Sequence, residues 1–349
     1  MANTQQIQPI GKTAKLIVED NVLALFSDEG LMTLSSAIFN GGFKKVKAVL
    51  NVGVPEGYND RFLHLDPLTL IRSSAAKLGL KNGYLAMVTA ANIKNYSLVT
   101  KKTEDFSVSV AATAGCSHGE SSGEHMNVEE APGTINILVL VDGKPTKSCM
   151  VASMITATEA KSAALRDFDV RSLYTGDSAT GSITDSMSIS STSQGKQIAY
   201  GGPASKLGEL VGFCTRTAVT QALLKQEPIW CHRTVLDRLK ERQLTLNKLA
   251  AEISKIEGLA VDEKALSRIV NDNPIANAYL LAAARLDDDY KKNLLPTELG
   301  NTDQLSERFG CLFHSEVDYP KISGHDLVDL PPFLKYSLIS IIREALYRK

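Results

Sequence analysis

The sequence lacks the features that mark membrane, secreted and polyanion-binding proteins. Its 38 Lys and Arg residues balance 39 Asp and Glu residues, so it has no basic excess for binding nucleic acid. The longest apolar stretches, such as residues 275–286, are shorter than the roughly 18 residues that a membrane span needs. The amino terminus has no apolar segment typical of a secretory signal. We therefore expect a cytoplasmic protein with no nucleic-acid partner and no membrane insertion.

Cysteine is scarce, and common catalytic motifs are absent. The five cysteines (Cys116, Cys149, Cys214, Cys231 and Cys311) are scattered and form no Cys-x-x-Cys pair. This pattern favours free thiols in a reducing compartment over disulfides or a zinc site. The sequence has no Walker loop, Rossmann glycine fingerprint, HExxH or GxSxG motif, which excludes the commonest enzyme classes that a short motif defines.

What is present is an ordinary globular composition, 44% apolar and 22% charged, with enough residues for about two domains. Strands are predicted at residues 15–18, 22–26, 31–37, 47–51, 84–89, 96–101, 106–112, 134–141 and 183–190, and a helix at 67–78. Hairpin-length connections between these runs predict an α+β fold, a largely antiparallel sheet flanked by helices. A mixed α/β sandwich is the alternative.

Two long helices follow. The first, over 147–167, carries a stripe that we expect to face the core: Val151, Met154, Ile155, Thr158, Lys161, Ser162, Leu165 and Phe168. The second begins after the N-cap Ser205, ends near 226 and has Leu207, Leu210, Val211, Cys214, Ala218 and Ala222 on its stripe. Gly208 and Gly212 lie on a neighbouring face, where a chain segment or ligand can approach closely.

The character of the sequence changes at Pro228. Helices are predicted at 231–242, 246–256, 263–270, 275–286 and 332–348, with no strand between them. We therefore expect an α+β domain over 1–227 and an all-helical domain of unassigned role over 228–349.

Three groups of residues carry candidate chemistry. Clusters rich in Gly, Ser, Thr and Asn stand where strands end, at 40–42, 113–117, 132–134, 179–185 and 200–202; they are either tight turns or ligand-binding loops. Thr158, Glu159 and Lys161 place a carboxylate and an amine near the buried edge of a helix, unless both are solvated surface charges. His118, Glu120, Glu124 and His125 lie in a Gly- and Ser-rich stretch without established metal-site spacing, so we expect a polar loop and no metal site. Cys116 follows a Thr-Ala-Gly turn and is either a reactive or a packed thiol.

Several segments occur together in the order and spacing of one family. They are NGG at 40–42, AVLN at 48–51, TAG at 113–115, PGTINI at 132–137, ITATEAKSAAL at 155–165, DVRSLYTGDSATGSITD at 169–185 and YGGPASKLGELVG at 200–212. Over about residues 15–226 the chain resembles the adenosylcobinamide amidohydrolases (CbiZ family). The resemblance implies hydrolysis of the amide that joins the aminopropanol arm to the corrin ring, giving adenosylcobyric acid and 1-amino-2-propanol for corrinoid salvage. One departure stands at His118-Gly119, where relatives usually carry an Asn.

Three interpretations stay open: an amide hydrolase, a non-catalytic corrinoid-binding or carrier protein, and an interaction protein whose helical half docks a partner. For the hydrolase, amide cleavage needs an attacking oxygen, oxyanion stabilisation and a proton for the leaving amine. Our hypothesis assigns water activation to Glu159, positive charge or a proton to Lys161 or His118, and orientation to Asp185. Thr184 and backbone N–H groups of the Gly41-Gly42 or Gly115 turns would hold the oxyanion.

The resemblance and the loop clusters also define expected binding residues. Those for the small-molecule corrinoid substrate are Asn40, Gly41, Gly42, Asn51, Thr113, Gly115, Ser117, Thr134, Asn136, Thr158, Tyr200 and Gly202. We expect hydrolysis to need no metal or other cofactor beyond the cobalt of the substrate. The oligomeric state is open, a homo-oligomer included.

Overall fold

The computed structural model describes residues 6–55, 66–117, 119–125, 133–296, 301–313 and 328–347. The chain divides into two compact units. The first comprises Met1–Tyr174 and Ser178–Cys231, and the second comprises Thr175–Asp177 and His232–Lys349.

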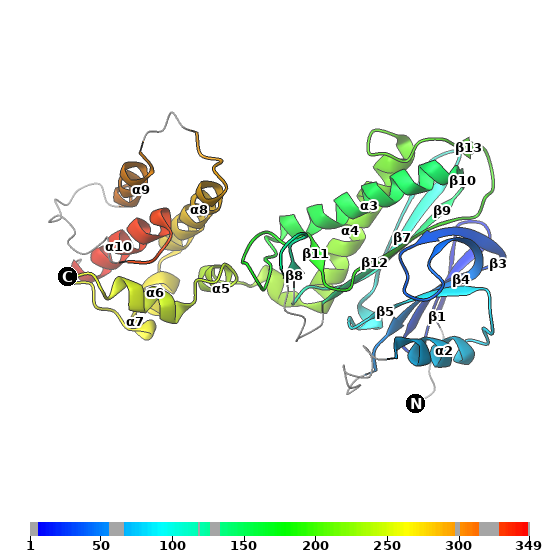
Figure 1. Ribbon diagram of the computed structural model, residues 1–349, viewed down its shortest axis with the longest axis horizontal. Coiled ribbons are helices and arrows are strands. Elements are labelled where there is room, and N and C mark those ends of the chain that lie inside the picture. Colours follow the sequence, from blue (N-terminus) through cyan, green and yellow to red (C-terminus); the bar gives the residue numbers. More distant parts are fainter. Residues whose placement is uncertain are drawn as a thin grey trace. The chain divides into compact units, whose positions relative to one another are not determined.

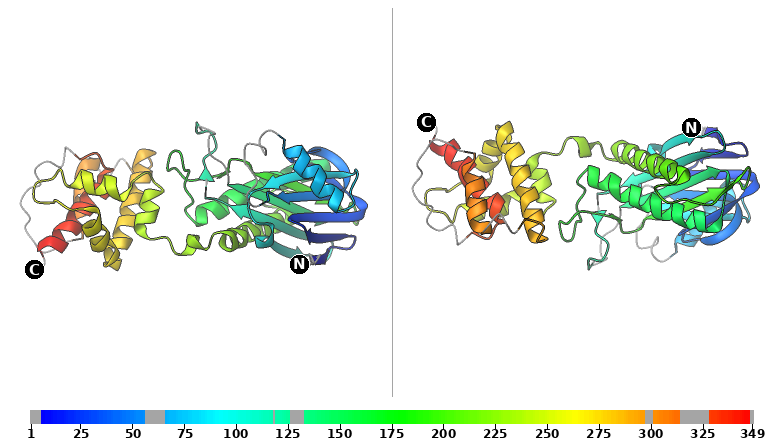
Figure 2. Two further views of the ribbon diagram at one scale, coloured as in Figure 1. Left: turned by 90° about the horizontal axis from the view of Figure 1, so that it is seen from below. Right: turned by 90° about the horizontal axis from the view of Figure 1, so that it is seen from above.

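One curled, mostly antiparallel sheet forms the centre of the first unit (Figures 1 and 2). Its described strands are β1 (Gln6–Ile10), β2 (Ala14–Glu19), β3 (Val22–Ser35), β4 (Gly42–Gly53), β5 (Tyr84–Thr89), β6 (Ser97–Lys102), β7 (Ser107–Gly115), β9 (Thr134–Asp142) and β12 (Ser186–Ser191). The order is β1-β2-β3-β12-β9-β7-β6, and β4 pairs with both β3 and β5. In this sheet β4–β5 and β9–β12 are parallel pairs. The α+β prediction is confirmed.

Two short pairings stand beside the sheet. β8 (Gly119–Glu120) pairs antiparallel with β11 (Gly181–Ser182). β10 (Lys144–Pro145) pairs in parallel with β13 (Gln197–Ile198). The first of these pairings joins two loops that are distant in the sequence.

The prediction of separate strands at 22–26 and 31–37 is wrong, because β3 runs continuously from Val22 to Ser35. Its pairing with β4 shifts between Phe26 and Leu31, and the exposed polar residues in this irregularity resemble a turn in the sequence. Such a bulge bends a strand without ending it.

Two helices cover one face of the sheet, and a third covers β4 and β5 on the other side of the curl (Figure 1). α3 (Lys147–Asp167) and α4 (Lys206–Gln226) pack on β7, β9 and β12, whereas α2 (Pro67–Lys77) packs on β4 and β5. Side chains along β9 point alternately to the two faces of the sheet. Those that pack in the core under α3 and α4 are Ile135, Ile137, Val139 and Val141. Leu138 and Leu140 face the opposite core. A short 3₁₀ helix, η1 (Ile93–Asn95), precedes β6, and η2 (Pro228–Cys231) follows α4.

The predicted core face of α3 is wrong at three of its eight positions, whereas Lys161 and Leu165 are buried and Met154, Ser162 and Phe168 are partly buried. Val151 and Ile155 are 50% and 57% exposed, and Thr158 is exposed as well. The buried face consists mainly of small residues: Cys149, Met150, Ser153, Thr156, Ala157, Ala160, Lys161, Ala164 and Leu165. Small side chains let α3 and α4 approach closely, and they give no apolar stripe that a sequence pattern can detect.

The predicted stripe of α4 is confirmed, because all six of its residues are buried. Ser205 caps the helix by accepting the Gly208 N–H at 3.0 Å. A Cβ on Gly208 would lie 1.9 Å from the Gly202 carbonyl oxygen, so this position needs glycine for the close approach of the preceding loop.

The second unit contains, in the described residues, the helices α5 (Val235–Lys240), α6 (Leu246–Ile253), α7 (Glu263–Asn271), α8 (Pro274–Lys291), α9 (Thr302–Cys311) and α10 (Pro332–Tyr347). Leu249, Leu266, Leu280, Leu334 and Ile342 are among the residues of its core. The helices predicted after residue 228 are present, and α9 was not predicted. In the described parts of the chain, no helix is long and apolar enough to cross a membrane.

Candidate active site in the first unit

The sheet register brings four of the predicted loops to one edge. Ser35, at the end of β3, pairs with both Gly42 and Ser188, so the 36–42 turn lies beside the start of β12. β9 and β12 are parallel and begin together, and the last residue of β7, Gly115, pairs with Thr134. The loops before β9 and β12 and after β3 and β7 therefore share this edge.

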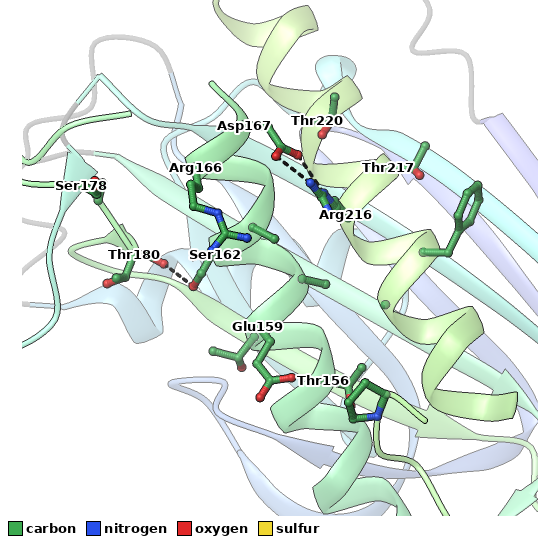
Figure 3. A pocket seen from close by; sticks show the side chains of 17 residues that line it. Thr156, Glu159, Ser162, Arg166, Asp167, Ser178, Thr180, Arg216, Thr217 and Thr220 are labelled. Atoms are coloured by element: carbon green, nitrogen blue, oxygen red, sulfur yellow. Dashed lines mark hydrogen bonds and ion pairs between the residues drawn. The ribbon is translucent and has the colours of Figure 1, made fainter. Parts of the chain in front are cut away.

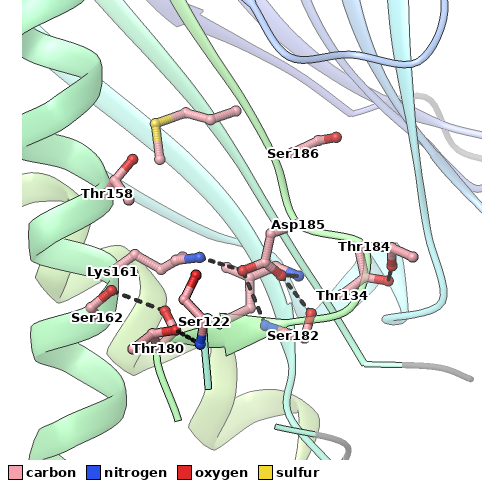
Figure 4. A network of polar contacts seen from close by, with 12 residues as sticks. Ser122, Thr134, Thr158, Lys161, Ser162, Thr180, Ser182, Thr184, Asp185 and Ser186 are labelled. Carbon is pink, nitrogen blue, oxygen red and sulfur yellow. Dashed lines mark hydrogen bonds and ion pairs between the residues drawn. The ribbon is translucent and has the colours of Figure 1, made fainter. Parts of the chain in front are cut away.

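A buried ion pair stands at this edge. The Lys161 ammonium of α3 binds the carboxylate of Asp185, which precedes β12, and the two side chains are only 11% and 16% exposed. Asp185 also accepts the Ile135 N–H at 2.9 Å, the Ser182 N–H at 3.2 Å and the Ser182 hydroxyl at 2.5 Å (Figure 4). These donors satisfy the carboxylate and fix its position, so the ammonium is held at a defined place.

Gly181 provides the space for this pair. A Cβ on Gly181 would lie 2.6 Å from Asp185 Oδ2 and 2.7 Å from Lys161 Nζ. The two charged groups occupy the space that a side chain at position 181 would need, which explains the glycine in the Thr-Gly-Ser turn.

Hydroxyl groups surround the pair (Figure 4). The Thr134 and Thr184 hydroxyls lie 2.8 Å apart, and Thr184 also donates to the Gly133 carbonyl at 3.2 Å. Ser162, next to Lys161 on α3, donates to the Thr180 carbonyl at 2.9 Å. Thr158 lies one helical turn before Lys161 and donates to a carbonyl of its own helix. The structure thus brings together Lys161, Asp185, Thr134, Thr158 and Thr184 of the predicted set.

Cys116 lies beside the pair as an unreactive thiol. It is 2% exposed. Burial raises its pKa well above the usual value, and the nearby carboxylates of Asp185 and Glu227 add to the rise. Because the thiolate is the nucleophilic form, this environment does not suit nucleophilic catalysis.

Glu227 is a feature of the site that the sequence did not indicate. Its Oε1 accepts the backbone N–H groups of Cys116 and Ser117 at 3.2 and 3.3 Å. It lies at the C-cap of α4, more than a hundred residues from its partners in the sequence. The backbone N–H groups of Cys116 and Ser117 therefore already donate to a carboxylate. This contact counts against the hypothesis that the turn after Gly115 holds an oxyanion.

A groove of about 980 Å³ runs between α3 and α4 (Figure 3). Hydroxyl side chains are frequent along it: Thr156, Thr158, Ser162, Ser178, Thr180, Thr217 and Thr220. Arg216 forms two hydrogen bonds to Asp167, at 2.6 and 2.7 Å, and Arg166 and Glu159 also line the groove. Thr158, Ser162 and Thr180 belong both to this groove and to the surroundings of the ion pair.

Glu159 and Lys161 are not brought together. Two residues apart on a helix differ by about 200° in direction. Lys161 is buried against Asp185, whereas Glu159 is exposed in the groove (Figures 3 and 4). The two side chains therefore lie on different faces of α3.

Asn51, Thr113 and Asn136 form a polar chain inside the fold. Asn51 donates to the Thr113 hydroxyl at 2.8 Å, and Asn136 donates to the Asn51 side-chain oxygen at 2.8 Å and to the Val88 carbonyl at 2.8 Å. Each of the three residues has at most 1% of its surface exposed. These groups satisfy one another and tie β4, β7, β9 and β5 together behind the edge.

The remaining predicted binding residues lie in two places. Asn40 and its two glycines form the turn between β3 and β4, where Asn40 donates to the Tyr84 carbonyl at 3.1 Å. The loop of Tyr200 and Gly202 packs on the first turns of α3, where Thr156 donates to the Gly201 carbonyl. Thr156 precedes Lys161 by five residues, which is about 7.5 Å along the helix axis. The loop of Tyr200 and Gly202 therefore lies along α3 on the amino-terminal side of the ion pair.

The candidate metal loop is only partly visible, because His118 lies outside the described residues. Glu124 Oε1 accepts the Ser121 N–H at 2.7 Å and the Ser172 hydroxyl at 2.5 Å. In the part of the chain that the structure describes, no three His, Cys, Asp or Glu side chains gather in a way that could hold a metal ion.

Two curated proteins are similar to this chain over about half of its length. An adenosylcobinamide amidohydrolase of Methanosarcina mazei is 28% identical over 190 residues, covering 53% of this chain and 83% of that protein. An uncharacterized protein of Methanocaldococcus jannaschii is 27% identical over 209 residues, covering 54% and 81%. A solved structure from Pyrococcus horikoshii aligns over 64% of this chain and 83% of its own at 10% identity, with a TM-score of 0.32, too low to indicate a shared fold.

The adenosylcobinamide amidohydrolase family profile matches residues 8–229. This span contains the sheet, the ion pair and the groove. The chain therefore belongs to the adenosylcobinamide amidohydrolase family.

Proposed function

We propose that this protein hydrolyses the aminopropanol amide of adenosylcobinamide to adenosylcobyric acid and 1-amino-2-propanol. The observation that carries the proposal is the family match over residues 8–229, which includes every residue of the Lys161–Asp185 site. We propose further that residues 1–227 form the catalytic domain, that the enzyme acts in the cytoplasm and that it needs no metal of its own.

The groove between α3 and α4 suits a corrinoid. Its volume of about 980 Å³ lies at the upper end of the roughly 300–1,000 Å³ of ligand sites. Its hydroxyl oxygens can accept hydrogen bonds from the amides at the edge of a corrin ring, although Thr156, Thr158 and Ser162 already donate their own protons within the chain. Thr158, Ser162 and Thr180 connect the groove to the ion pair, so a macrocycle in the groove could extend one amide arm toward Lys161.

The chemistry we propose at the pair is stabilisation of the oxyanion. Attack of water on an amide carbonyl places negative charge on the carbonyl oxygen, and a fixed positive charge lowers the energy of that state. The Lys161 ammonium supplies this charge. Asp185 keeps the ammonium in position, and its own donors from β9 and β11 prevent it from moving toward the substrate. Thr184 supplies a hydroxyl beside the same edge.

The test is incubation of the purified protein with adenosylcobinamide, with the products separated by chromatography and identified by mass. Equal amounts of adenosylcobyric acid and 1-amino-2-propanol are expected. Substrate that binds, as seen in the corrin absorbance, and is recovered unchanged would instead establish a non-catalytic corrinoid-binding protein. Chelator treatment, followed by measurement of the same rate, tests the proposed independence from metal: a rate that is lost and returns with stoichiometric Zn²⁺ would contradict it.

A further inference from the structure

Glu120 is brought to the Lys161–Asp185 pair by a short β-pairing. β8 pairs antiparallel with β11 so that Glu120 lies opposite Gly181, and the Thr180 N–H donates to the Glu120 carbonyl at 2.8 Å. Opposite residues of an antiparallel pair project to the same face. On that face, the space above Gly181 is filled by Lys161 Nζ and the Asp185 carboxylate. The Glu120 side chain therefore projects toward the ion pair.

The Glu120 carboxyl group is not fully satisfied. Its Oε2 is buried and has no hydrogen-bond partner among the described residues. A buried carboxyl oxygen without a partner is costly, unless a bound molecule supplies one. A substrate or water molecule that reaches this oxygen would supply the missing hydrogen bond.

The surroundings of Glu120 also favour proton transfer. Burial raises the pKa of its carboxyl group, the negative charges of Asp185 and Glu124 raise it further, and Lys161 opposes the rise. Among the described residues, these three are the charged groups that shift the pKa of Glu120, and they come from the segment before β12, the turn after β8 and α3. A carboxyl group whose pKa is moved up toward the operating pH is a better acid–base catalyst than an ordinary one.

The two neighbouring carboxyl groups have different environments. Asp185 accepts three hydrogen bonds and holds an ammonium, so its lone pairs are engaged. Glu120, on the same side, has an oxygen with no hydrogen-bond partner in the described part of the chain. In hydrolases, such paired carboxyl groups take different roles, one fixed and charged and the other exchanging a proton.

We propose that Glu120 is the general base and general acid of the amide hydrolysis. Its carboxylate accepts a proton from water as the water oxygen bonds to the carbonyl carbon, with the oxyanion beside Lys161. The carboxyl then gives this proton to the amide nitrogen as the C–N bond breaks. One water is consumed, a carboxylic acid and an amine are formed, and Glu120 returns to its starting state. This inference rests on the proposed function.

The experiment compares the full-length wild-type protein with E120Q, E120A and the matched control E104Q. Glu104 is an exposed glutamate in the turn between β6 and β7, at the opposite end of β7 from the site. For E120Q we expect kcat for adenosylcobinamide to fall by about 10²–10⁴-fold, the usual contribution of a general acid–base. We expect the Kd for the substrate and the thermal unfolding midpoint to be retained, and E104Q to match the wild type.

Two further measurements separate catalysis from a structural role. Formate should restore part of the activity of E120A in proportion to its concentration, because it replaces the missing carboxylate. The limb of the wild-type pH profile of kcat/KM that reports Glu120 should be absent in E120Q.

The outcomes are distinct. A wild-type protein without hydrolysis overturns the proposed function and this inference together. An active wild type with an equally active E120Q overturns only the role of Glu120. A loss of activity in E120A that formate does not reverse, with the pH profile unchanged in E120Q, also overturns it.

Discussion

Removal of Asp185 should destabilise the first unit more than removal of Lys161. In Asp185→Ala, the buried Lys161 ammonium loses its ion-pair partner, and the Ile135 and Ser182 donors lose their acceptor. Breaking a buried pair in this way costs about 3–5 kcal/mol. In Lys161→Met, the Asp185 carboxylate keeps three hydrogen bonds and the aliphatic stem is replaced by one of similar length. We expect a loss of about 1–3 kcal/mol there, the scale of one charge-assisted hydrogen bond with its desolvation.

Urea denaturation followed by fluorescence measures this difference. Trp230 is the single tryptophan of the chain and packs against the core of the first unit, so its emission reports that unit. The midpoint for Asp185→Ala should lie below that for Lys161→Met, with similar slopes. An equal or larger loss in Lys161→Met would refute the view that Asp185 is the fixed anchor and Lys161 the group that it positions.

Three other predictions concern Gly181, Asp287 and Glu159. Gly181→Ala should abolish hydrolysis while the protein stays folded by circular dichroism, because the new methyl group overlaps the Lys161–Asp185 pair; full activity would show that the pair does not need its present position. Burial raises the pKa of Asp287, which accepts two backbone N–H groups at the start of α10, to about 7. Between pH 4 and 7 the folded second unit therefore binds more protons at Asp287 than the unfolded chain does. The free energy of unfolding of this unit should fall by up to about 4 kcal/mol as the pH rises through this range. Hydrogen exchange of α10 at pH 5 and pH 8, corrected for intrinsic rates, should show this loss in the wild type and not in Asp287→Asn. Glu159→Gln should weaken corrinoid binding with little change in kcat. A fall in kcat at unchanged Kd would instead indicate that Glu159, and not Glu120, activates the water.

Much of the fold was predictable because its signals are local. The hairpin of β2 and β3 follows from two apolar runs around a Glu-Asp-Asn turn, and β9 from a continuous apolar run. Ser205 was identifiable as a cap from its side chain and the stripe after it. Each of these depends on neighbours in the chain.

The errors have physical causes. The core face of α3 consists mainly of Ala, Ser, Thr and Cys, while the apolar Val151 and Ile155 are exposed, so apolar periodicity shifts the predicted stripe toward solvent. α9 packs on α10 but is mostly polar, and the buried residues among those described in it are Ser306 and Gly310, so it has no apolar stripe to detect.

The site was predictable only in part. Lys161 and Asp185 stood out as charges in segments of the family pattern, but their contact depends on the crossover from β9 through α3 to β12. Glu120 was assigned to a loop, because a two-residue strand paired with β11 leaves no periodic signal. Glu227 contacts the end of β7 only through the packing of α4. Long-range contacts of this kind have no local sequence signature.

The central claim is that water cleaves the cobinamide amide beside the Lys161 ammonium. A single turnover in water enriched in heavy oxygen, with the wild type and Lys161→Met in parallel, tests it most directly. The account predicts one heavy oxygen in the adenosylcobyric acid formed by the wild type, and a rate for Lys161→Met lower by about 10²–10³-fold, as for loss of an oxyanion donor. Unchanged adenosylcobinamide with the wild type, or a wild-type rate in Lys161→Met, would contradict it.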